Sequence, residues 1–183
     1  MLVRLHNSVA VSVQRITEDW LIATLARLVF AGVFLIYFLN SVRTKLGEGL
    51  AGLVDLDDGA YVQILPREME AVGYDPAALT GLEQATVYAG TFGELILPVL
   101  IVAGLFTRIA AVGMIVFVAV MTYTDIAAHG ASAETIGAWF DNLAGSAIAD
   151  QRALWGFLLL VLALKGPGPL SLDALLGRLW VAR

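Results

Sequence analysis

The chain has 183 residues, 59% of them hydrophobic, and a formal net charge of −5. This apolar fraction, with a mean hydropathy of +0.82, exceeds what a soluble domain carries and predicts a membrane protein. The chain has no cysteine, which excludes disulfides, thiolate-held iron–sulfur clusters and covalent thiol chemistry. We expect the bilayer, and no nucleic acid, among its partners.

The first segment is predicted to form a helix on the membrane surface. Apolar side chains recur in it at spacings of three or four, which is typical of an amphipathic interfacial helix; they are Leu2, Leu5, Val9, Val13 and Ile16. A plain cytosolic extension is the alternative. The first 19 residues carry charges and lack a continuous apolar core, so we do not expect a cleavable signal peptide.

Four later segments are apolar enough to cross a bilayer, which takes about 20 residues per helix. They comprise residues 20–40, 85–106, 109–124 and 152–165. We therefore predict an all-α, four-transmembrane-helix bundle, a single domain over residues 1–183 with amphipathic interfacial helices at both ends. The closing helix has Ser171 as its predicted N-cap and Asp173 in its first turn.

Two loops, residues 41–84 and 125–151, are predicted on the side opposite the termini. The first is rich in acids and is either solvated or a lid over the bundle; Pro66 and Gly73 bound a predicted short helix within it. Asp75 followed by Pro76 predicts that the second membrane helix begins outside the bilayer. In the second loop, apolar residues at helical spacing between 136 and 143 predict an interfacial helix.

The charges predict the orientation. The side with both termini carries six bases and three acids, and the loop side carries four bases and twelve acids. The positive-inside rule therefore predicts cytoplasmic termini. His6 and His129 then lie on opposite sides of the membrane, so one chain cannot supply a two-histidine haem site. A metal site of His129 with Asp125 is conceivable, but we expect a solvated or capping role and predict no metal.

One carboxylate, Glu94, interrupts the second span. An ionisable group at this depth costs about 3 kcal/mol or more unless it has a partner. Pro98, four residues on, has no N–H and leaves the carbonyl of residue 94 free. Both groups need partners inside protein or a wet cavity, since lipid supplies none. Thr91 lies on the same helical face, and we interpret this polar turn as a candidate functional site.

Arg27 of the first span is the predicted partner of Glu94. With a rise of about 1.5 Å per residue, Arg27 and Glu94 are predicted at different depths in the membrane. An extended arginine side chain is long enough to cover most of this difference. The alternative is that Arg27 snorkels to the nearer headgroups. We hypothesise an Arg27–Glu94 ion pair.

Three stretches of the chain read GELILPVLIVAGLFTRIAA, DQRALWGFLLLVLALKGPG and PLSLDALL. Through these stretches, together with Arg27 and Lys45, the chain resembles the DoxX family of four-helix bacterial membrane proteins. Where the family commonly has histidine and glycine, this chain has Asn40 and Ser41. The resemblance implies a bacterial inner-membrane location and an association with quinone-linked redox chemistry, including thiosulfate:quinone oxidoreduction.

These observations predict a membrane subunit or partner of a quinone-linked redox system, at most a subunit of an oxidoreductase because no self-sufficient catalytic constellation is recognisable. The candidate ligand-binding residues are Arg27, Tyr37, Lys45, Thr91, Glu94, Asp125 and Arg152. The alternative is a non-enzymatic scaffold or maturation partner for a periplasmic protein or metal-handling peptide, which the acidic loop side favours. Other membrane or periplasmic subunits, or a second copy of the chain, are the expected protein partners. A small transporter is a weaker third interpretation.

Overall fold

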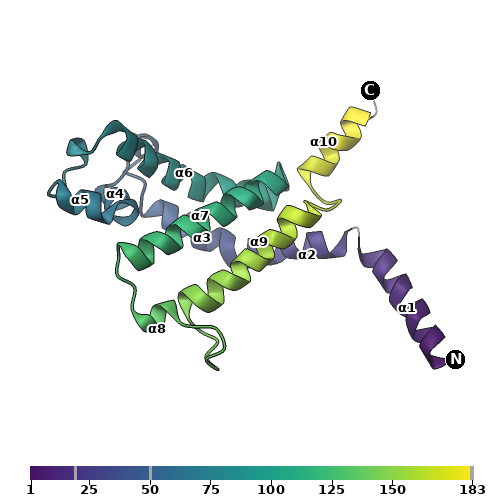
Figure 1. Cartoon of the computed structure of the whole chain (residues 1–183). Helices are drawn as coiled ribbons and strands as arrows, with labels where there is room; N and C mark the ends of the chain where they lie inside the picture. The colour runs from purple at the N-terminus through teal and green to yellow at the C-terminus, as the bar shows by residue number, and fades with distance from the viewer. Residues whose placement is uncertain (19, 50, 182–183) are drawn as a thin grey trace.

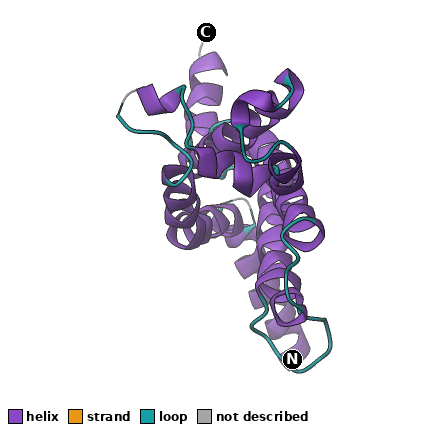
Figure 2. Ribbon diagram, turned by 90° about the vertical axis from the view of Figure 1, so that its left-hand side faces the viewer, coloured by secondary structure: helices purple, strands orange, loops and turns teal. Residues whose placement is uncertain are grey.

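Apolar helical runs separated by glycine and proline form ten α-helices in the computed structural model, which describes residues 1–18, 20–49 and 51–181. Their bounds are α1 Leu2–Thr17, α2 Leu21–Phe30, α3 Ile36–Arg43, α4 Asp58–Ile64, α5 Pro66–Ala71, α6 Gly81–Ala103, α7 Thr107–Ala127, α8 Ala133–Ile136, α9 Ala153–Lys165 and α10 Leu172–Val181. Figure 2 shows the helices and the loops that connect them. The predicted all-α fold is confirmed.

Four continuous helical stretches of the described chain are long and apolar enough to cross a membrane. They are Leu21–Arg43, Gly81–Ala103, Thr107–Ala127 and Ala147–Lys165. The first joins α2 to α3 through a π-helical segment, Ala31–Leu35, and the fourth begins with another, Ala147–Arg152. Both termini lie at one end of the bundle, here called the terminal end, and α4, α5 and α8 lie at the other, the loop end (Figure 1).

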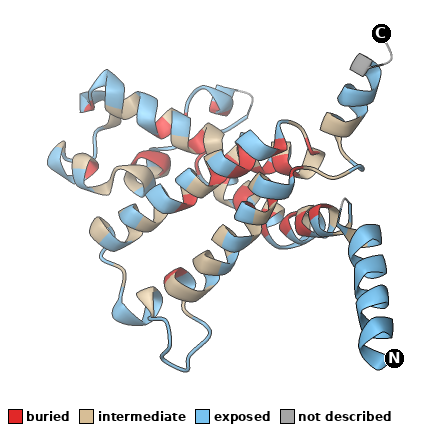
Figure 3. Cartoon of the chain, turned by 45° about the vertical axis from the view of Figure 1, so that its right-hand side comes forward, coloured by how far each residue is buried: buried red, intermediate tan, exposed pale blue. Residues whose placement is uncertain are grey.

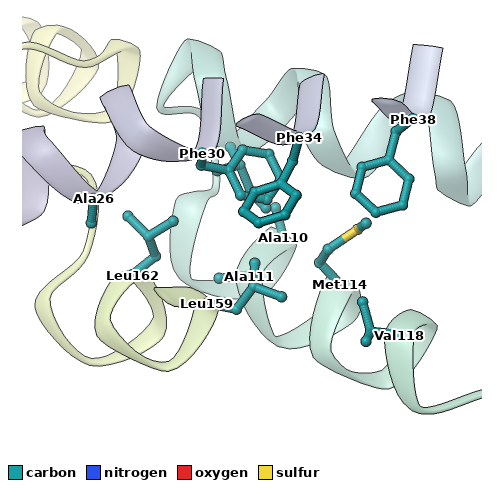
Figure 4. Packing of buried hydrophobic residues seen from close by; sticks show 11 residues of the cluster. Ala26, Phe30, Phe34, Phe38, Ala110, Ala111, Met114, Val118, Leu159 and Leu162 are labelled. Atoms are coloured by element: carbon teal, nitrogen blue, oxygen red, sulfur yellow. The ribbon is translucent and has the colours of Figure 1, made fainter. Parts of the chain in front are cut away.

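The spans form a closed ring in which the first contacts the second, the second the third, the third the fourth, and the fourth the first. The interior is filled by phenylalanines of the first span, such as Phe30 and Phe38, against Met114 of α7 and Leu159 and Leu162 of α9 (Figure 4). These side chains are almost completely buried. Apolar packing therefore fills the bundle interior from Ala26, towards the terminal end, to Val118, towards the loop end.

The second span is fixed at both ends by local signals. Thr80 and Glu83 form a reciprocal capping box at its start, so α6 begins at Gly81. The prediction that Asp75 starts this helix is wrong, because its carboxylate caps a short 3-10 turn instead, Pro76–Ala78. At the other end Gly104 has a φ of 70°, which a residue without a Cβ adopts freely.

The first loop folds into a small helical unit, here called the cap, residues 44–80 except residue 50. Its core is formed by apolar side chains that pack against Val87 near the start of α6, namely Leu56, Ala60, Tyr61, Met69 and Leu79. The predicted short helix after Pro66 is confirmed as α5, and the chain turns at Gly73. Tyr88 of α6 donates a hydrogen bond to the Val54 carbonyl oxygen at 2.6 Å. The cap is thus anchored on the second span.

The second loop differs from its prediction. Helix α8 is only Ala133–Ile136, and the expected helix between 136 and 143 is not formed. Gly137, Phe140 and Asn142 have positive φ values, which are incompatible with a continuing α-helix. Ser146 instead caps the next helix by accepting from the Asp150 N–H, so the fourth span starts at Ala147 rather than at residue 152.

The two terminal helices extend away from the bundle (Figures 1 and 3). Helix α1 has no buried residue, and its apolar face is exposed. The predicted N-cap of the last helix is confirmed, since the Ser171 hydroxyl accepts from the Ala174 N–H at 3.1 Å. Both amphipathic helices are therefore formed, and their position on the membrane surface stays a prediction.

Candidate functional site

A buried ion pair joins the first two spans near the loop end. The Lys45 ammonium nitrogen lies 2.8 Å from a Glu94 carboxylate oxygen, and the two residues are 5% and 3% exposed. Lys45 follows the end of α3, and its long side chain reaches back to the bundle while also donating to the Ser41 hydroxyl at 2.7 Å. A residue outside the helix thereby supplies the counter-ion that Glu94 requires.

The hypothesised Arg27–Glu94 pair is wrong. The Arg27 guanidinium points to the terminal end and donates to four carbonyl oxygens, those of Ile101 (3.2 Å), Val102 (2.8 Å), Pro167 (2.8 Å) and Leu170 (2.6 Å). Two of these carbonyls belong to the last turn of α6, which lacks the regular helical N–H partners four residues on; the Ile101 carbonyl also accepts from the Gly104 N–H at 3.1 Å. The helix dipole also places partial negative charge there. Arg27 is thus satisfied by backbone, far along α6 from Glu94.

Asp173 completes this arrangement at the terminal end. Its carboxylate accepts from the N–H groups of Phe106 (2.8 Å) and Thr107 (3.0 Å), at the start of α7, and its own N–H donates to the Gly104 carbonyl (2.8 Å). The sequence predicted that Asp173 serves the first turn of its own helix, and the structure shows it capping a second helix as well. We call Arg27, Asp173 and the α6–α7 turn the terminal clamp.

A pocket of about 490 Å³ lies at the loop end, between α3, α6 and α7 and beneath the cap. Its polar lining includes Tyr37, Ser41, Lys45, Gln63, Thr86, Glu94, Thr124, Asp125, His129 and Arg152. Its apolar lining includes Ile64, Ala89, Leu97, Val116, Phe117, Val120 and Met121, with Gly90, Gly93 and Gly113. An apolar pocket with a few convergent polar groups is the usual form of a small-molecule site.

Five of the seven predicted site residues line this pocket. They are Tyr37, Lys45, Glu94, Asp125 and Arg152, which come from all four spans and the start of the cap. Arg27 and Thr91 do not line it. Thr91 is nevertheless completely buried one turn before Glu94, and its hydroxyl has no hydrogen-bond partner among the described residues.

A second ion pair borders the same pocket. A terminal guanidinium nitrogen of Arg152 contacts the Asp125 carboxylate, and the other donates to the Thr122 hydroxyl at 2.8 Å. Sequence reasoning named Asp125 and Arg152 as neighbours of the site but did not predict that they pair. The two residues lie far apart in the chain, on either side of the irregular second loop. They meet because α7 and α9 are adjacent.

Contacts from the cap to the end of α7 lie on the loop side of the pocket. The His129 imidazole forms a 3.0 Å hydrogen bond with the Gln63 carbonyl oxygen, and Arg67 donates to the Ala127 carbonyl. Sequence reasoning missed Ser41, Gln63 and His129 as lining residues. Ser41 carried a signal, its position four residues before Lys45, whereas Gln63 carried none because it lies in an unpredicted helix.

The cap also holds a perturbed tyrosine. Burial raises the pKa of Tyr61 to about 12, and a hydrogen bond with the Tyr88 side chain acts in the same direction. Both effects favour the neutral phenol. The cap core is therefore built around an uncharged Tyr61.

The geometry determines what the pocket can do chemically. Lys45 and Arg152 offer hydrogen-bond donors, Glu94 and Asp125 offer acceptors, and each base is already paired with an acid. The pocket interior thus has both kinds of group without a net charge from these pairs. Such a site suits a neutral ligand that carries polar oxygen atoms on an otherwise apolar body.

The fold and the site together define a polytopic helical membrane protein in which a buried ion pair lines a pocket. The family model described as DoxX matches residues 22–130, more than half of the chain. The chain belongs to the DoxX family. No curated protein and no solved structure matches it.

Proposed function

We propose that this protein is the membrane subunit of a quinone-linked redox system, and that it binds the quinone head in the loop-end pocket. The observation that carries the proposal is the position of the Lys45–Glu94 pair, which is buried within the spans and lines a pocket of about 490 Å³. That volume lies within the usual range for small-molecule sites, roughly 300 to 1,000 Å³.

The chemistry of a quinone matches these groups. Its carbonyl oxygens accept hydrogen bonds, which Lys45 and Arg152 can donate, and the hydroxyls of the reduced form can donate to Glu94 or Asp125. Reduction of one quinone to quinol adds two electrons and two protons. In this proposal a partner oxidoreductase supplies the electrons, and the acid–base pairs of the pocket exchange the protons with water at the loop end.

The proposal places the protein in a bacterial inner membrane with its termini in the cytoplasm. The terminal side carries six basic residues and the loop side carries four, which supports this orientation. The loop-end pocket then lies towards the periplasmic side. A partner subunit at that side is consistent with the exposed cap.

Quinone extraction tests the proposal. The protein is purified in mild detergent, and quinone per chain is measured in the parent and in the folded fractions of Lys45→Met and Glu94→Gln. Arg43→Met and Glu134→Gln are matched controls, because both residues are exposed and outside the pocket. We expect quinone near one per chain in the parent and controls, and strong depletion in both pocket variants. Quinone at the lipid background in every sample would contradict the proposal.

A scaffold for a periplasmic protein is the second candidate function, and the surface of the cap favours it. Six acids are exposed there, namely Glu48, Asp55, Asp57, Asp58, Glu70 and Asp75. Such a surface attracts a basic partner, with a strong dependence on salt. Replacing these six acids by their amides should abolish partner capture and leave quinone content unchanged if the cap is a docking surface. Unchanged capture would remove this candidate.

A further inference from the structure

One wall of the loop-end pocket faces the bilayer. Val116 and Val120 of α7 line the pocket, yet they are 58% and 59% exposed. Together with Val112 they form a stripe at a spacing of four, which is one face of the helix. In a membrane-spanning helix an exposed apolar stripe faces lipid. The same two valines therefore border both the pocket and the hydrocarbon.

The opposing helix has no side chain at this level. Gly93 precedes Glu94 on α6 and lines the pocket, and a Cβ there would lie 3.8 Å from the Phe117 ring, an ordinary contact distance. Further towards the terminal end the two helices are close, because a Cβ on Gly113 would meet the Leu97 side chain at 3.1 Å. Towards the terminal end, the space beside Gly93 therefore ends at Leu97 and Gly113.

The depth of this wall restricts what can pass it. With a rise of about 1.5 Å per residue, Glu94 lies about 9 Å beyond Tyr88, where the cap contacts α6, and about 14 Å from the end of this helix. Both distances place Glu94 in the part of α6 that crosses the hydrocarbon core, which is about 30 Å thick. A molecule that enters beside Gly93 must carry its polar head through hydrocarbon. Such passage is prohibitive for a charged headgroup and tolerable for a neutral one.

We infer that the ligand enters the pocket sideways from the bilayer, between α6 and α7 past Gly93 and Val120, and that it has an uncharged polar head and an apolar tail. The head reaches Lys45 and Glu94, and the tail stays between the helices on the exposed valine stripe. This inference rests on the proposed function, since it describes how a quinone would reach that same site. It excludes phospholipids as the ligand, and it excludes entry through the loop end.

Two probes with one headgroup test the route: a benzoquinone with a ten-carbon tail and the same benzoquinone without a tail. Gly93→Leu fills the gap beside Phe117, and Gly156→Leu is the matched control, because a side chain at Gly156 would meet nothing within 4 Å and this residue does not line the pocket. We expect Gly93→Leu to weaken binding of the tailed probe by about tenfold or more, as a steric block does, and Gly156→Leu to have no effect.

The outcomes separate the inference from the proposed function. If the parent binds neither probe, the proposed function fails. If the parent binds the tailed probe and Gly93→Leu binds it equally well, the tail does not lie between the helices beside Gly93, and entry past that residue is overturned while the quinone site stands. Melting temperature identifies any Gly93→Leu sample that has not folded, and in that case Gly93→Ala and Val120→Trp replace it.

Chemical labelling tests the opening without any ligand. Because the chain has no native cysteine, Val120→Cys provides a single thiol. In proteoliposomes we expect it to react with a lipid-soluble maleimide and to resist a membrane-impermeant one applied to either side, whereas Ser132→Cys in the exposed second loop reacts with the impermeant reagent. Equal reaction of both thiols with the impermeant reagent would show a water-filled opening and overturn the inference.

Discussion

Lys45 and Glu94 are 49 positions apart in the chain, and their charged atoms lie 2.8 Å apart inside the bundle. The pair joins the end of the first span to the middle of the second. Both side chains lose nearly all contact with solvent, so each depends on the other for compensation of its charge. The pair therefore fixes how these two spans meet and also provides the polar groups of the pocket.

Breaking this pair from one side should destabilise the protein. We expect Lys45→Met or Glu94→Gln alone to lower the free energy of unfolding by about 3 to 5 kcal/mol, because an unpaired charge or polar group remains buried. In the double variant, the free energy of unfolding should fall by less than the sum of the decreases in the two single variants. Reversible unfolding in mixed micelles measures all three.

A second double-mutant cycle is the control for this result. Arg27 contacts backbone carbonyls rather than Glu94, so Arg27→Met and Glu94→Gln should have additive effects. Additivity in the Lys45 cycle, together with a large coupling in the Arg27 cycle, would contradict the assignment of partners.

Arg27 should be sensitive even to lysine. The guanidinium donates to carbonyls at two separate segments, the end of α6 and the residues before α10, and an ammonium group lacks this planar set of donors. We expect Arg27→Lys to cost about 1.5 to 3 kcal/mol, the range for hydrogen bonds with a charged partner. Limited proteolysis should then cut first between α9 and α10. Cleavage unchanged from the parent would show that the clamp does not hold this segment.

Asp173→Asn tests the capping of α7. The amide oxygen can accept only part of the set of bonds that the carboxylate receives from Phe106 and Thr107, and it lacks the charge that favours a helix N-terminus. We expect a loss of about 1 kcal/mol. Glu70→Gln, an exposed acid of the cap, is the control and should be within error of the parent. An equal loss of stability in Asp173→Asn and Glu70→Gln would mean that the change in net charge, and not the loss of the cap, causes the effect.

Alkaline pH should weaken the cap through Tyr61. Its pKa is about 12 in the folded protein and about 10 in an unfolded chain, so folding favours the neutral phenol. This contribution is fully present below pH 10 and is lost as the pH rises to about 12. The free energy of unfolding should therefore fall less steeply over that range in Tyr61→Phe than in the parent. Tyr74→Phe, an exposed tyrosine of the cap, should follow the parent curve, and identical slopes in all three proteins would contradict the role of Tyr61.

Hydropathy and local signals predicted much of the fold. The four spans follow from apolar runs, and Pro66 and Ser171 mark helix starts through backbone geometry that is local to each residue. The second loop was mispredicted because Gly137 and two further residues with positive φ override apolar spacing. Local backbone conformation outweighs hydrophobic periodicity in such a short segment.

The partner of Glu94 could not be found from charge balance within the spans. Arg27 and Glu94 were the charges inside the apolar runs, and Lys45 lay just outside them, so pairing by depth favoured the wrong base. A lysine side chain is long enough to reach back along its own helix, and the four carbonyls that bind Arg27 become acceptors only after α6, α9 and α10 meet. Tertiary geometry, absent from a single sequence, decides both contacts.

Photoaffinity labelling with an azido-quinone shows where the quinone head binds. The purified parent protein is crosslinked, and the labelled peptides are mapped by mass spectrometry with and without excess unlabelled quinone. We expect competed labels on α6 between 86 and 97 and on α7 between 113 and 125, the two segments that line the pocket around Lys45 and Glu94. Labels that are not competed and are spread over the lipid-facing helices, or that centre on Arg27 and α10, would contradict this expectation.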